Sequence, residues 1–384
     1  MKTVYINDAA AFLPNEPVSN DHIDRVLGEL PNIGSRTRRI VLKQNQIRTR
    51  YYAVDRKTGA LTHSCAELAA EAVRRLRPSG DFQLQEIECL CCGTSTPDLL
   101  LPGHGLMVLG ELGIDECDAI STSGICLSAM AALKYAYMNV AAGLSKNAVA
   151  VGSELASSLT RARFMVPVME AAKADALEKR PISAFDADFL RWMLSDGAGA
   201  VYLSAGRRPD RTALQIDWIE SISLAGGLET CMYAGGVKGK DGRITGWRDT
   251  ERIPTQAGPY LTAIRQDIRL LDREIVPSMG RVLSRVIEKR GLDPEKIDWF
   301  LPHYSSAYFR PKFYDEMARI GFEIPYERWF TNLSEKGNTG TAAIFIILEE
   351  LFHSGRLKPG ERLLCFIPES GRFTHCFMHL TVVG

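Results

Sequence analysis

Three side chains in this sequence have the types and settings needed for acyl chemistry. Cys126 lies in a run of small residues, 123–128, directly before an apolar helix-like stretch. A cysteine there can act as a nucleophile, because unpaired N–H groups and the helix dipole at a helix N-terminus favour the thiolate. His303 follows an apolar run, and Asn338 lies in a Gly-flanked turn before a second apolar helix. Together they predict a Cys, His, Asn site. Without the other two, Cys126 would be interpreted as a small buried hydrophobe.

Strands and helices that alternate along the chain must position these residues, and their alternation predicts an α/β fold. Ser64 and Glu67 form a capping-box pattern that opens an amphipathic helix ending near residue 77. We expect strands at 87–93 and 148–153, with an apolar central helix at 126–142 between them. Residues 160–194 are predicted to form an insertion that acts as a lid or pocket wall.

The second half of the chain repeats this order of elements. We expect a helix at 281–289, a strand at 297–303, a helix at 342–353 and a strand at 363–368. If Ile87 is matched to Ile297, Gly93 falls opposite His303, and Cys126 and Asn338 follow at similar intervals. The pattern predicts a whole-domain duplication, with halves at 1–210 and 211–384 and the two helix N-termini facing each other.

Composition narrows the class of protein. A chain of 384 residues exceeds the usual size of a single core. Its 46 basic and 46 acidic residues cancel, which argues against a nucleic-acid partner. We expect no signal peptide and no membrane span. The nine irregularly spaced cysteines indicate reduced thiols and a cytoplasmic protein, and Cys89, Cys91 and Cys92 lack the second pair that a zinc site needs.

Seven segments in order resemble the ketoacyl-ACP synthase III branch of the thiolase-fold condensing enzymes. They are residues 46–50, 93–98, the Cys126 turn, 151–157, 195–200, His303 and 337–340. The resemblance implies a five-layer αβαβα fold of two duplicated halves, a homodimer, no metal and no cofactor. It also implies acyl thioester substrates carried by acyl carrier protein or CoA.

The resemblance also implies roles for individual residues. Cys126 would accept an acyl group, dividing a carbon–carbon bond formation into two easier steps. His303 and Asn338 would donate hydrogen bonds to the enolate oxygen of a second thioester. The backbone N–H groups of Cys126 and Gly371 would form an oxyanion hole, although Arg372 stands where the family usually has a glycine run.

Other residues bear on the substrate. A basic loop containing Arg36, Arg38 and Arg39 is predicted either to bind a phosphopantetheine phosphate or acidic carrier, or to be an ordinary solvated face. No tryptophan is close to this loop in the sequence, which weakens the case for an adenine-stacking site there. Glu154, at a strand end, is predicted to be either a catalytic base or a structural hydrogen-bonding residue.

The motif His303-Tyr304-Ser305-Ser306 and the segment 368–374 resemble the corresponding segments of the ketosynthase/cyclases that make dialkylresorcinol and bacterial stilbene precursors. The best interpretation is therefore an acyltransferase that joins two β-ketoacyl-type units and closes a cyclohexanedione ring. Two alternatives remain. One is an ordinary decarboxylative ketoacyl-ACP synthase III that starts fatty-acid or polyketide chains. The other is a non-catalytic subunit of a condensing heterodimer.

Overall fold

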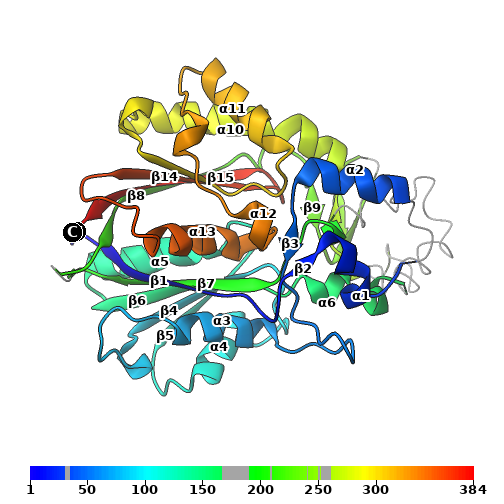
Figure 1. Cartoon of the computed structure of the whole chain (residues 1–384), viewed down its shortest axis with the longest axis horizontal. Coiled ribbons are helices and arrows are strands. Elements are labelled where there is room, and N and C mark those ends of the chain that lie inside the picture. The colour runs from blue at the N-terminus through cyan, green and yellow to red at the C-terminus, as the bar shows by residue number, and fades with distance from the viewer. Residues whose placement is uncertain (31–34, 167–189, 208–209, 240, 250, 252–260) are drawn as a thin grey trace.

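A computed structural model of the chain describes residues 1–30, 35–166, 190–207, 210–239, 241–249, 251 and 261–384 (Figure 1). Within these residues, nine strands form one continuous sheet in the order β13-β14-β15-β8-β1-β7-β6-β4-β5. Their bounds are β1 Tyr5–Phe12, β4 Cys89–Thr94, β5 Asp118–Ser123, β6 Asn147–Glu154, β7 Gly197–Ser204, β8 Ala213–Ser223, β13 Trp299–Pro302, β14 Arg362–Glu369 and β15 Thr374–Val383. Every residue of β4 and β6 is buried, as expected for strands covered on both faces.

Helices lie between the two parts of this sheet and on its outer faces, so that the fold is layered (Figure 1). The larger ones are α2 Ser35–Asn45, α3 Cys65–Arg74, α4 His104–Leu112, α5 Ser128–Ala142, α10 Ile268–Arg290, α11 Phe309–Arg319 and α13 Ala343–Phe352. The sheet bends at the short β8–β1 pairing, so α5 and α13 lie between its two parts, while α10 and α11 cover one outer face and α3 and α4 the other. The predicted five-layer αβαβα architecture is confirmed.

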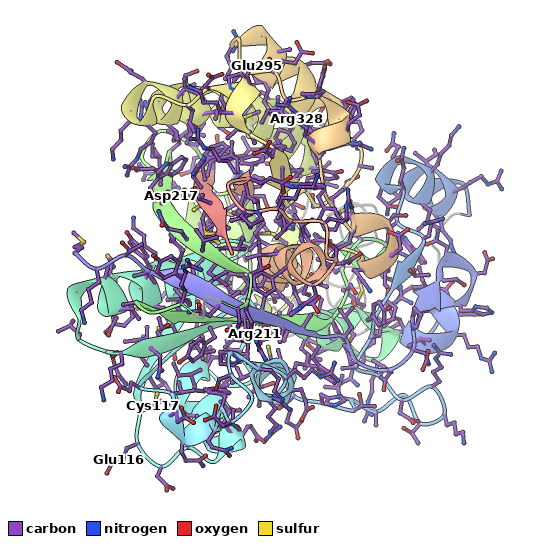
Figure 2. The ribbon with its side chains drawn as sticks, turned by 60° about the vertical axis from the view of Figure 1, so that its left-hand side comes forward. Glu116, Cys117, Arg211, Asp217, Glu295 and Arg328 are labelled. Atoms are coloured by element: carbon purple, nitrogen blue, oxygen red, sulfur yellow. The ribbon has the colours of Figure 1, made fainter. Side chains whose placement is uncertain are left out.

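Figure 2 shows how side chains fill the space between the layers. Glu116 and Cys117 mark the outer layer that contains α4, and Glu295 and Arg328 mark the opposite outer layer. Between them, Val201, Leu348 and Met378 belong to one buried apolar cluster that spans both parts of the sheet. This shared core explains why the two parts hold a fixed geometry relative to each other.

The two parts of the sheet have matching topology. In the first, β4 is parallel to β6, and then β7 and β1 follow antiparallel. In the second, β13 is parallel to β14, and then β15 and β8 follow antiparallel. Strand β5 is an additional edge of the first part. The division of the chain at residues 210 and 211 into duplicated halves remains our proposal, and this matching order supports it.

Glycines let the central helix α5 lie directly on the sheet. A Cβ atom at Gly93 would lie 2.5 Å from the backbone nitrogen of Ala129, and one at Gly152 would lie 2.7 Å from the Ala129 Cβ. Both distances are too short for any larger side chain. The N-terminal end of α5, where Cys126 is located, is therefore placed by backbone contact with β4 and β6.

Most predicted elements are present with small shifts at their ends. Ser64 and Glu67 make both hydrogen bonds of the capping box that starts α3. The helix predicted at 281–289 is longer than expected, because α10 begins at Ile268, where the Asp267 side chain accepts the N–H of Leu270. Pro277 is tolerated inside α10, whose apolar face is buried on both sides of it.

The predicted insertion at 160–194 is only partly described. Its first residues follow α6 (Ser157–Thr160), and its last, from Leu190 onwards, return to the core. Residues 167–189 lie outside the described residues. Separately, no helix in the described part of the chain is both long and apolar enough to cross a membrane.

Several short strands near the pocket complete the fold. Strand β2 (Val18–Ser19) pairs with β3 (Thr49–Arg50), β9 (Met232–Tyr233) with β12 (Arg265–Gln266), and β10 (Gly236–Lys238) with β11 (Ile244–Gly246). The β9–β12 pair sets Gln266 directly opposite Met232. Both residues recur in the pocket described below.

The C-terminal end of α13 is attached to β1 by a pH-sensitive contact. His353 Nε2 lies 2.8 Å from the Ala9 carbonyl oxygen and 3.4 Å from Asp8 Oδ1. The bond to Asp8, followed by that to Ala9, raises the pKa of His353 to about 9. A folded-state pKa above the unfolded value means that protonated His353 stabilises the fold below about pH 6.5, and that this stabilisation is lost as pH rises through 9.

We therefore expect His353→Gln to lower the thermal midpoint of unfolding at pH 6 by about 2 °C or less, because a half-exposed ion pair contributes about 1 kcal/mol at most. The difference from the wild type should vanish by pH 10. Differential scanning fluorimetry at both pH values measures this, with the exposed His22→Gln as control. A destabilisation that is equal at both pH values would contradict the assignment.

Candidate active site

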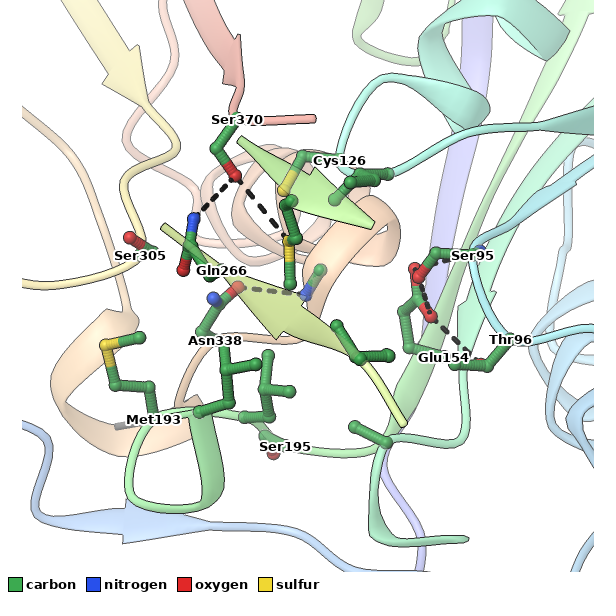
Figure 3. Close-up of a pocket in the computed structure, with 17 residues that line it drawn as sticks. Ser95, Thr96, Cys126, Glu154, Met193, Ser195, Gln266, Ser305, Asn338 and Ser370 are labelled. Carbon is green, nitrogen blue, oxygen red and sulfur yellow. Dashed lines mark hydrogen bonds between the residues drawn. The ribbon is translucent and has the colours of Figure 1, made fainter. Parts of the chain in front are cut away.

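One pocket opens where the central layer meets the ends of the strands (Figure 3). Three residues predicted from the sequence line it, namely Cys126, Glu154 and Asn338. Most of the remaining wall is apolar, with a few polar groups; its members are Ser95, Thr96, Ile125, Ala156, Leu190, Met193, Leu194, Ser195, Met232, Ile264, Gln266, Ser305, Gly340 and Ser370. Leu190, Met193 and Leu194 come from the end of the predicted insertion, which therefore contributes to a pocket wall.

Cys126 lies just before α5 and is held there by Thr341 from the other half of the chain. Thr341 Oγ1 accepts the Ala129 N–H at 2.6 Å, lies 3.0 Å from Ser128 Oγ and is 3.2 Å from the Cys126 carbonyl oxygen. The N-terminus of α5 is thus bonded to the segment that carries Asn338. The predicted convergence of the two helix N-termini is visible in these bonds.

The resting form of Cys126 differs from the sequence prediction. Burial is the largest influence and raises the pKa of the Cys126 thiol, and the nearby carboxylates of Glu369 and Glu154 raise it further. Burial and these carboxylates oppose the thiolate that the helix N-terminus is expected to favour. Cys126 rests as a neutral thiol and must lose its proton as it reacts.

Asn338 is oriented by its own neighbours. Its backbone N–H donates to the Met193 carbonyl at 3.0 Å, and its carbonyl accepts the Ser195 N–H at 2.9 Å. Its side-chain Oδ1 accepts the Gly340 N–H at 3.0 Å. With the amide oxygen engaged in this way, the Nδ2 hydrogens are the groups that can serve a ligand.

His303 follows strand β13 and is 3% exposed. It is not among the residues that line the pocket, although Ser305, two positions later, is. Burial lowers the pKa of His303 to about 4, so the imidazole is neutral near pH 7. A neutral imidazole has one N–H to donate and one nitrogen that can accept.

Glu154 ends strand β6 and receives several hydrogen bonds. Ser95 Oγ donates to it at 2.6–2.7 Å, Thr96 Oγ1 at 3.0 Å, and the Ser95 and Thr341 backbone N–H groups at 3.2 Å each. Burial raises the pKa of Glu154 to about 7, against the lowering effect of these donors. The carboxyl group can therefore exchange a proton near neutral pH, and the same contacts serve a structural role.

Gly340 makes room for this carboxyl group. It has φ +54°, and a Cβ atom there would lie 2.8 Å from Glu154 Cγ and 2.9 Å from Oε1. The glycine after Asn338-Thr339 is thus required both by the backbone conformation and by the side chain that packs against it.

The predicted oxyanion donor Gly371 lies close to the nucleophile, but its N–H is engaged. A Cβ atom at Gly371 would lie 2.8 Å from Cδ1 of Ile125, the residue before Cys126. The Gly371 N–H donates to Glu369 Oε1 at 2.5 Å, and the N–H groups of Arg372 and Thr374 also point to this carboxylate. The role of Gly371 in an oxyanion hole remains a prediction, and it requires Glu369 to share this donor.

The basic segment differs from the predicted loop, because residues 35–45 form helix α2. Arg38 is bonded to Asp24 and the Asn20 carbonyl, and its guanidinium lies 4.8 Å from the centre of the Trp192 ring. A tryptophan is thus close in space, contrary to the sequence expectation, but it is 1% exposed and cannot stack on an adenine. Arg39 is exposed, and the side chain of Arg36 lies outside what the structure describes.

Sequence reasoning missed four residues of the site: Thr341, Glu369, Gln266 and Ser370. Thr341 had a local signal, since a threonine at the start of a helix next to Asn338 can cap a neighbouring element. Glu369 and Ser370 stand in the segment 368–374, which was noted for its resemblance and for the backbone N–H of Gly371, but not for these two side chains. Gln266 had no local sequence signal, because strand β12 is only two residues long.

Among the described residues, no group of three or more His, Cys, Asp or Glu side chains is arranged to hold a metal ion. The pocket itself offers the thiol, carboxamide, carboxyl and hydroxyl groups named above. Asp196 caps backbone groups: it accepts the N–H groups of Ala53 and Ser157, each at 2.7 Å.

Comparison with known proteins shows what this chain is similar to. The profile of the family described as 3-oxoacyl-[acyl-carrier-protein (ACP)] synthase III C terminal matches residues 287–368. A β-ketoacyl-[acyl-carrier-protein] synthase III of Rhizorhabdus wittichii is 25% identical over 379 residues, which cover 97% of this chain and 98% of the relative. The enzyme of the same name from Novosphingobium aromaticivorans is 26% identical over 374 residues, 96% of each chain.

Solved structures share the fold. AbyA1, a tetronic acid condensing enzyme, superposes with a TM-score of 0.75 at 23% identity, covering 99% of this chain and 100% of AbyA1. A histidine-to-alanine variant of Xanthomonas campestris OleA gives a TM-score of 0.72 at 20% identity, covering 99% of this chain and 98% of OleA.

The position of Glu369 yields a prediction about Cys126. Glu369→Gln removes the largest charge effect on the thiol, so the pKa of Cys126 should fall and its alkylation by iodoacetamide below pH 8 should become several-fold faster. Peptide mass spectrometry isolates the signal of Cys126 from that of the other cysteines. Glu116→Gln, the same charge change on a distant exposed surface, is the control. An unchanged alkylation profile in a folded Glu369→Gln protein would show that Glu369 does not act on the thiol.

Proposed function

We propose that the chain, which is similar to ketoacyl-ACP synthase III enzymes over nearly its whole length and shares their fold, is a ketosynthase and cyclase. It joins two β-ketoacyl-type thioesters and closes a cyclohexanedione ring, the precursor of a dialkylresorcinol. The observation that carries this proposal is the presence of Glu154, a carboxyl group with a pKa of about 7, in the same pocket as Cys126 and Asn338.

The first step loads the enzyme. The sulfur of Cys126 attacks the carbonyl of an acyl thioester borne by acyl carrier protein or CoA, and the donor thiol leaves with the proton that Cys126 loses. The carbonyl oxygen carries negative charge during this exchange. The N–H of Cys126 stabilises it, together with that of Gly371 once Glu369 shares this donor.

The second step forms the first carbon–carbon bond. A second thioester binds with its carbonyl oxygen at the Nδ2 group of Asn338 and the N–H of neutral His303. Both donors stabilise the enolate that forms when an α-proton is removed or a carboxylate is lost. The carbanion attacks the acyl carbonyl on Cys126, the carbon–sulfur bond breaks, and the thiolate of Cys126 takes back a proton.

Ring closure needs one more proton transfer from carbon, and Glu154 is the group proposed to accept it. A base with a pKa near the working pH is the most effective, since it is both largely ionised and basic enough to take the proton. Ser95 and Thr96, which donate to Glu154, keep the carboxylate facing the pocket. The proton then leaves with the group that ring closure expels.

An ordinary decarboxylative synthase is the second candidate. It is favoured by one observation, that the similar proteins from Rhizorhabdus wittichii and Novosphingobium aromaticivorans are both named β-ketoacyl-ACP synthase III. Such an enzyme would use Cys126, His303 and Asn338 in the same way but would release a linear product and leave Glu154 a structural role.

The product distinguishes the two. With β-ketoacyl carrier-protein thioesters the wild type should give a cyclic product, and Glu154→Gln should lower its formation by about 100-fold while acyl-Cys126 still forms. Ring closure in the wild type should slow as pH falls through about 7, because Glu154 becomes protonated. Cys126→Ala is the control that abolishes the adduct. Intact-protein and product mass spectrometry provide both readouts, and a strictly linear wild-type product would overturn the cyclase proposal.

We further propose that the chain functions as a homodimer through the edge of strand β5. An edge strand presents backbone groups to which a second copy can add. Ser121 on β5 accepts the N–H of Gly105, so the start of α4 is bonded to this strand, four positions after Leu101 in the sequence. Leu100 and Leu101 are 79% and 85% exposed, a cluster of apolar groups that an interface would cover.

Light scattering should therefore give twice the chain mass of 42.5 kDa, and Leu101→Lys should weaken the association. Leu144→Lys, at another exposed leucine, is the matched control and should leave the mass unchanged. A wild-type mass equal to one chain would exclude the dimer.

A further inference from the structure

Two groups of hydrogen-bonded polar side chains lie apart from each other in the pocket (Figure 3). Glu154, with Ser95 and Thr96, forms one group. The other contains Gln266 and Ser370, beside Cys126 (Figure 3). The mechanism above uses the first group but assigns no part to Gln266 and Ser370.

The hydrogen bonds of this second group have a defined direction. Gln266 Nε2 donates to Ser370 Oγ at 3.1 Å, since an amide nitrogen has no lone pair to accept with. The Ser370 hydroxyl therefore directs its own hydrogen elsewhere, and it lies 3.7 Å from Met232 Sδ. A thioether is a weak acceptor, so a carbonyl oxygen entering the pocket would be a better partner for this hydrogen.

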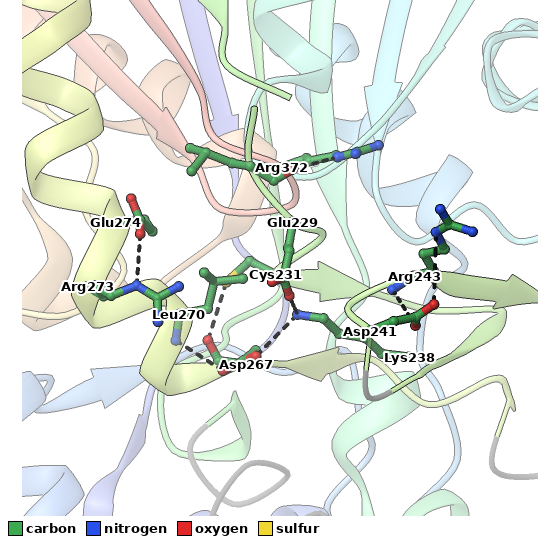
Figure 4. A network of polar contacts seen from close by, with 11 residues as sticks. Glu229, Cys231, Lys238, Asp241, Arg243, Asp267, Leu270, Arg273, Glu274 and Arg372 are labelled. Atoms are coloured by element: carbon green, nitrogen blue, oxygen red, sulfur yellow. Dashed lines mark hydrogen bonds and ion pairs between the residues drawn. The ribbon is translucent and has the colours of Figure 1, made fainter. Parts of the chain in front are cut away.

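Both residues are held firmly in place. Gln266 and Met232 are opposite each other in the β9–β12 pair, and the Gly371 carbonyl, next to Ser370, accepts the Cys231 N–H at 2.8 Å. Next to Gln266, Asp267 caps α10 and bonds to Lys238, which also pairs with Glu229 (Figure 4). A donor fixed in this way loses little conformational freedom when a ligand binds.

The charges around the pocket define the acceptor. The carboxylates of Glu154 and Glu369 both act on Cys126, so an anionic group on the bound acyl chain would be repelled. A neutral carbonyl oxygen suits the site. The loop of Ser370 and Gly371 packs against Ile125, the residue before the nucleophile, and Ser370 lines the same pocket as Cys126.

We propose that the Ser370 hydroxyl, oriented by Gln266, binds the β-keto oxygen of the acyl group on Cys126 and thereby selects β-ketoacyl over simple acyl thioesters. This inference rests on the proposed function, because it requires that Cys126 is acylated. It adds a specificity-determining contact to that function and assigns Gln266 as a positioning residue.

The test is a competition for Cys126. Equal concentrations of the 3-oxooctanoyl and octanoyl thioesters of N-acetylcysteamine are offered, and the two adducts on Cys126 are counted by intact-protein mass spectrometry. Loss of one hydrogen bond of about 1 kcal/mol corresponds to roughly a fivefold change in the adduct ratio. We expect Ser370→Ala to shift the ratio toward octanoyl by about this factor, and Gln266→Leu to shift it in the same direction.

Two controls separate recognition from general damage. Ser370→Thr keeps the hydroxyl and should retain the wild-type ratio. Ser305→Ala removes another pocket hydroxyl and should leave the ratio unchanged. Because both thioesters compete for one enzyme, a uniform loss of activity does not alter the ratio.

The outcomes are distinguishable. If Ser370→Ala gives the wild-type ratio while Cys126 is still acylated, the inference is overturned and the proposed function stands. If Ser305→Ala shifts the ratio as much as Ser370→Ala, the assignment to Ser370 is also overturned. If neither thioester acylates wild-type Cys126, the proposed function fails and the inference falls with it.

Discussion

The site depends on one hydroxyl group, that of Thr341, which joins the two parts of the sheet at the point where chemistry would occur. The hydroxyl oxygen of Thr341 bonds to Ala129 and Ser128 at the start of α5 and lies 3.2 Å from the Cys126 carbonyl oxygen. The backbone N–H of Thr341 donates to Glu154. The thiol and the carboxyl group are therefore positioned from the same residue. Because the glycines of β4 and β6 bring α5 into backbone contact with the sheet, little freedom remains for this geometry to relax.

The electrostatics of the pocket follow from this closeness. Two carboxylates near a buried thiol disfavour a second negative charge, so Cys126 keeps its proton at rest. An acyl thioester can lessen this constraint, since its carbonyl accepts the developing charge on oxygen while the thiol proton leaves. Burial raises the pKa of Glu154 to about 7. Burial thus makes the thiol of the empty pocket less reactive and makes the carboxyl group a better base near neutral pH. Both effects favour a reaction that begins only when substrate fills the pocket.

The sequence predicted the parts of the site that depend on local patterns, but not those that depend on contacts between residues far apart in the chain. Cys126, Asn338 and Glu154 stand in local patterns, a helix start, a Gly-flanked turn and a strand end, and all three reach the pocket. The effect of Glu369 on Cys126 and the contact of Arg38 with Trp192 arise from tertiary packing, which periodicity does not encode. The layers of the fold were predictable because β4, β6 and α5 are rich in small and apolar residues. Strands β9 and β12, each two residues long, carried no periodic signal.

These charges also bear on which second substrate suits the pocket. A malonyl group would bring a free carboxylate toward Glu154 and Glu369, and its repulsion would have to be offset by binding energy elsewhere. A β-ketoacyl group is neutral, and the carbon between its two carbonyls gives up a proton more readily than that of a simple thioester. Under the proposed function, a base of pKa about 7 would suffice, with Asn338 to stabilise the enolate oxygen. The carboxylates that raise the pKa of the thiol would then also favour neutral β-ketoacyl substrates over decarboxylative extension.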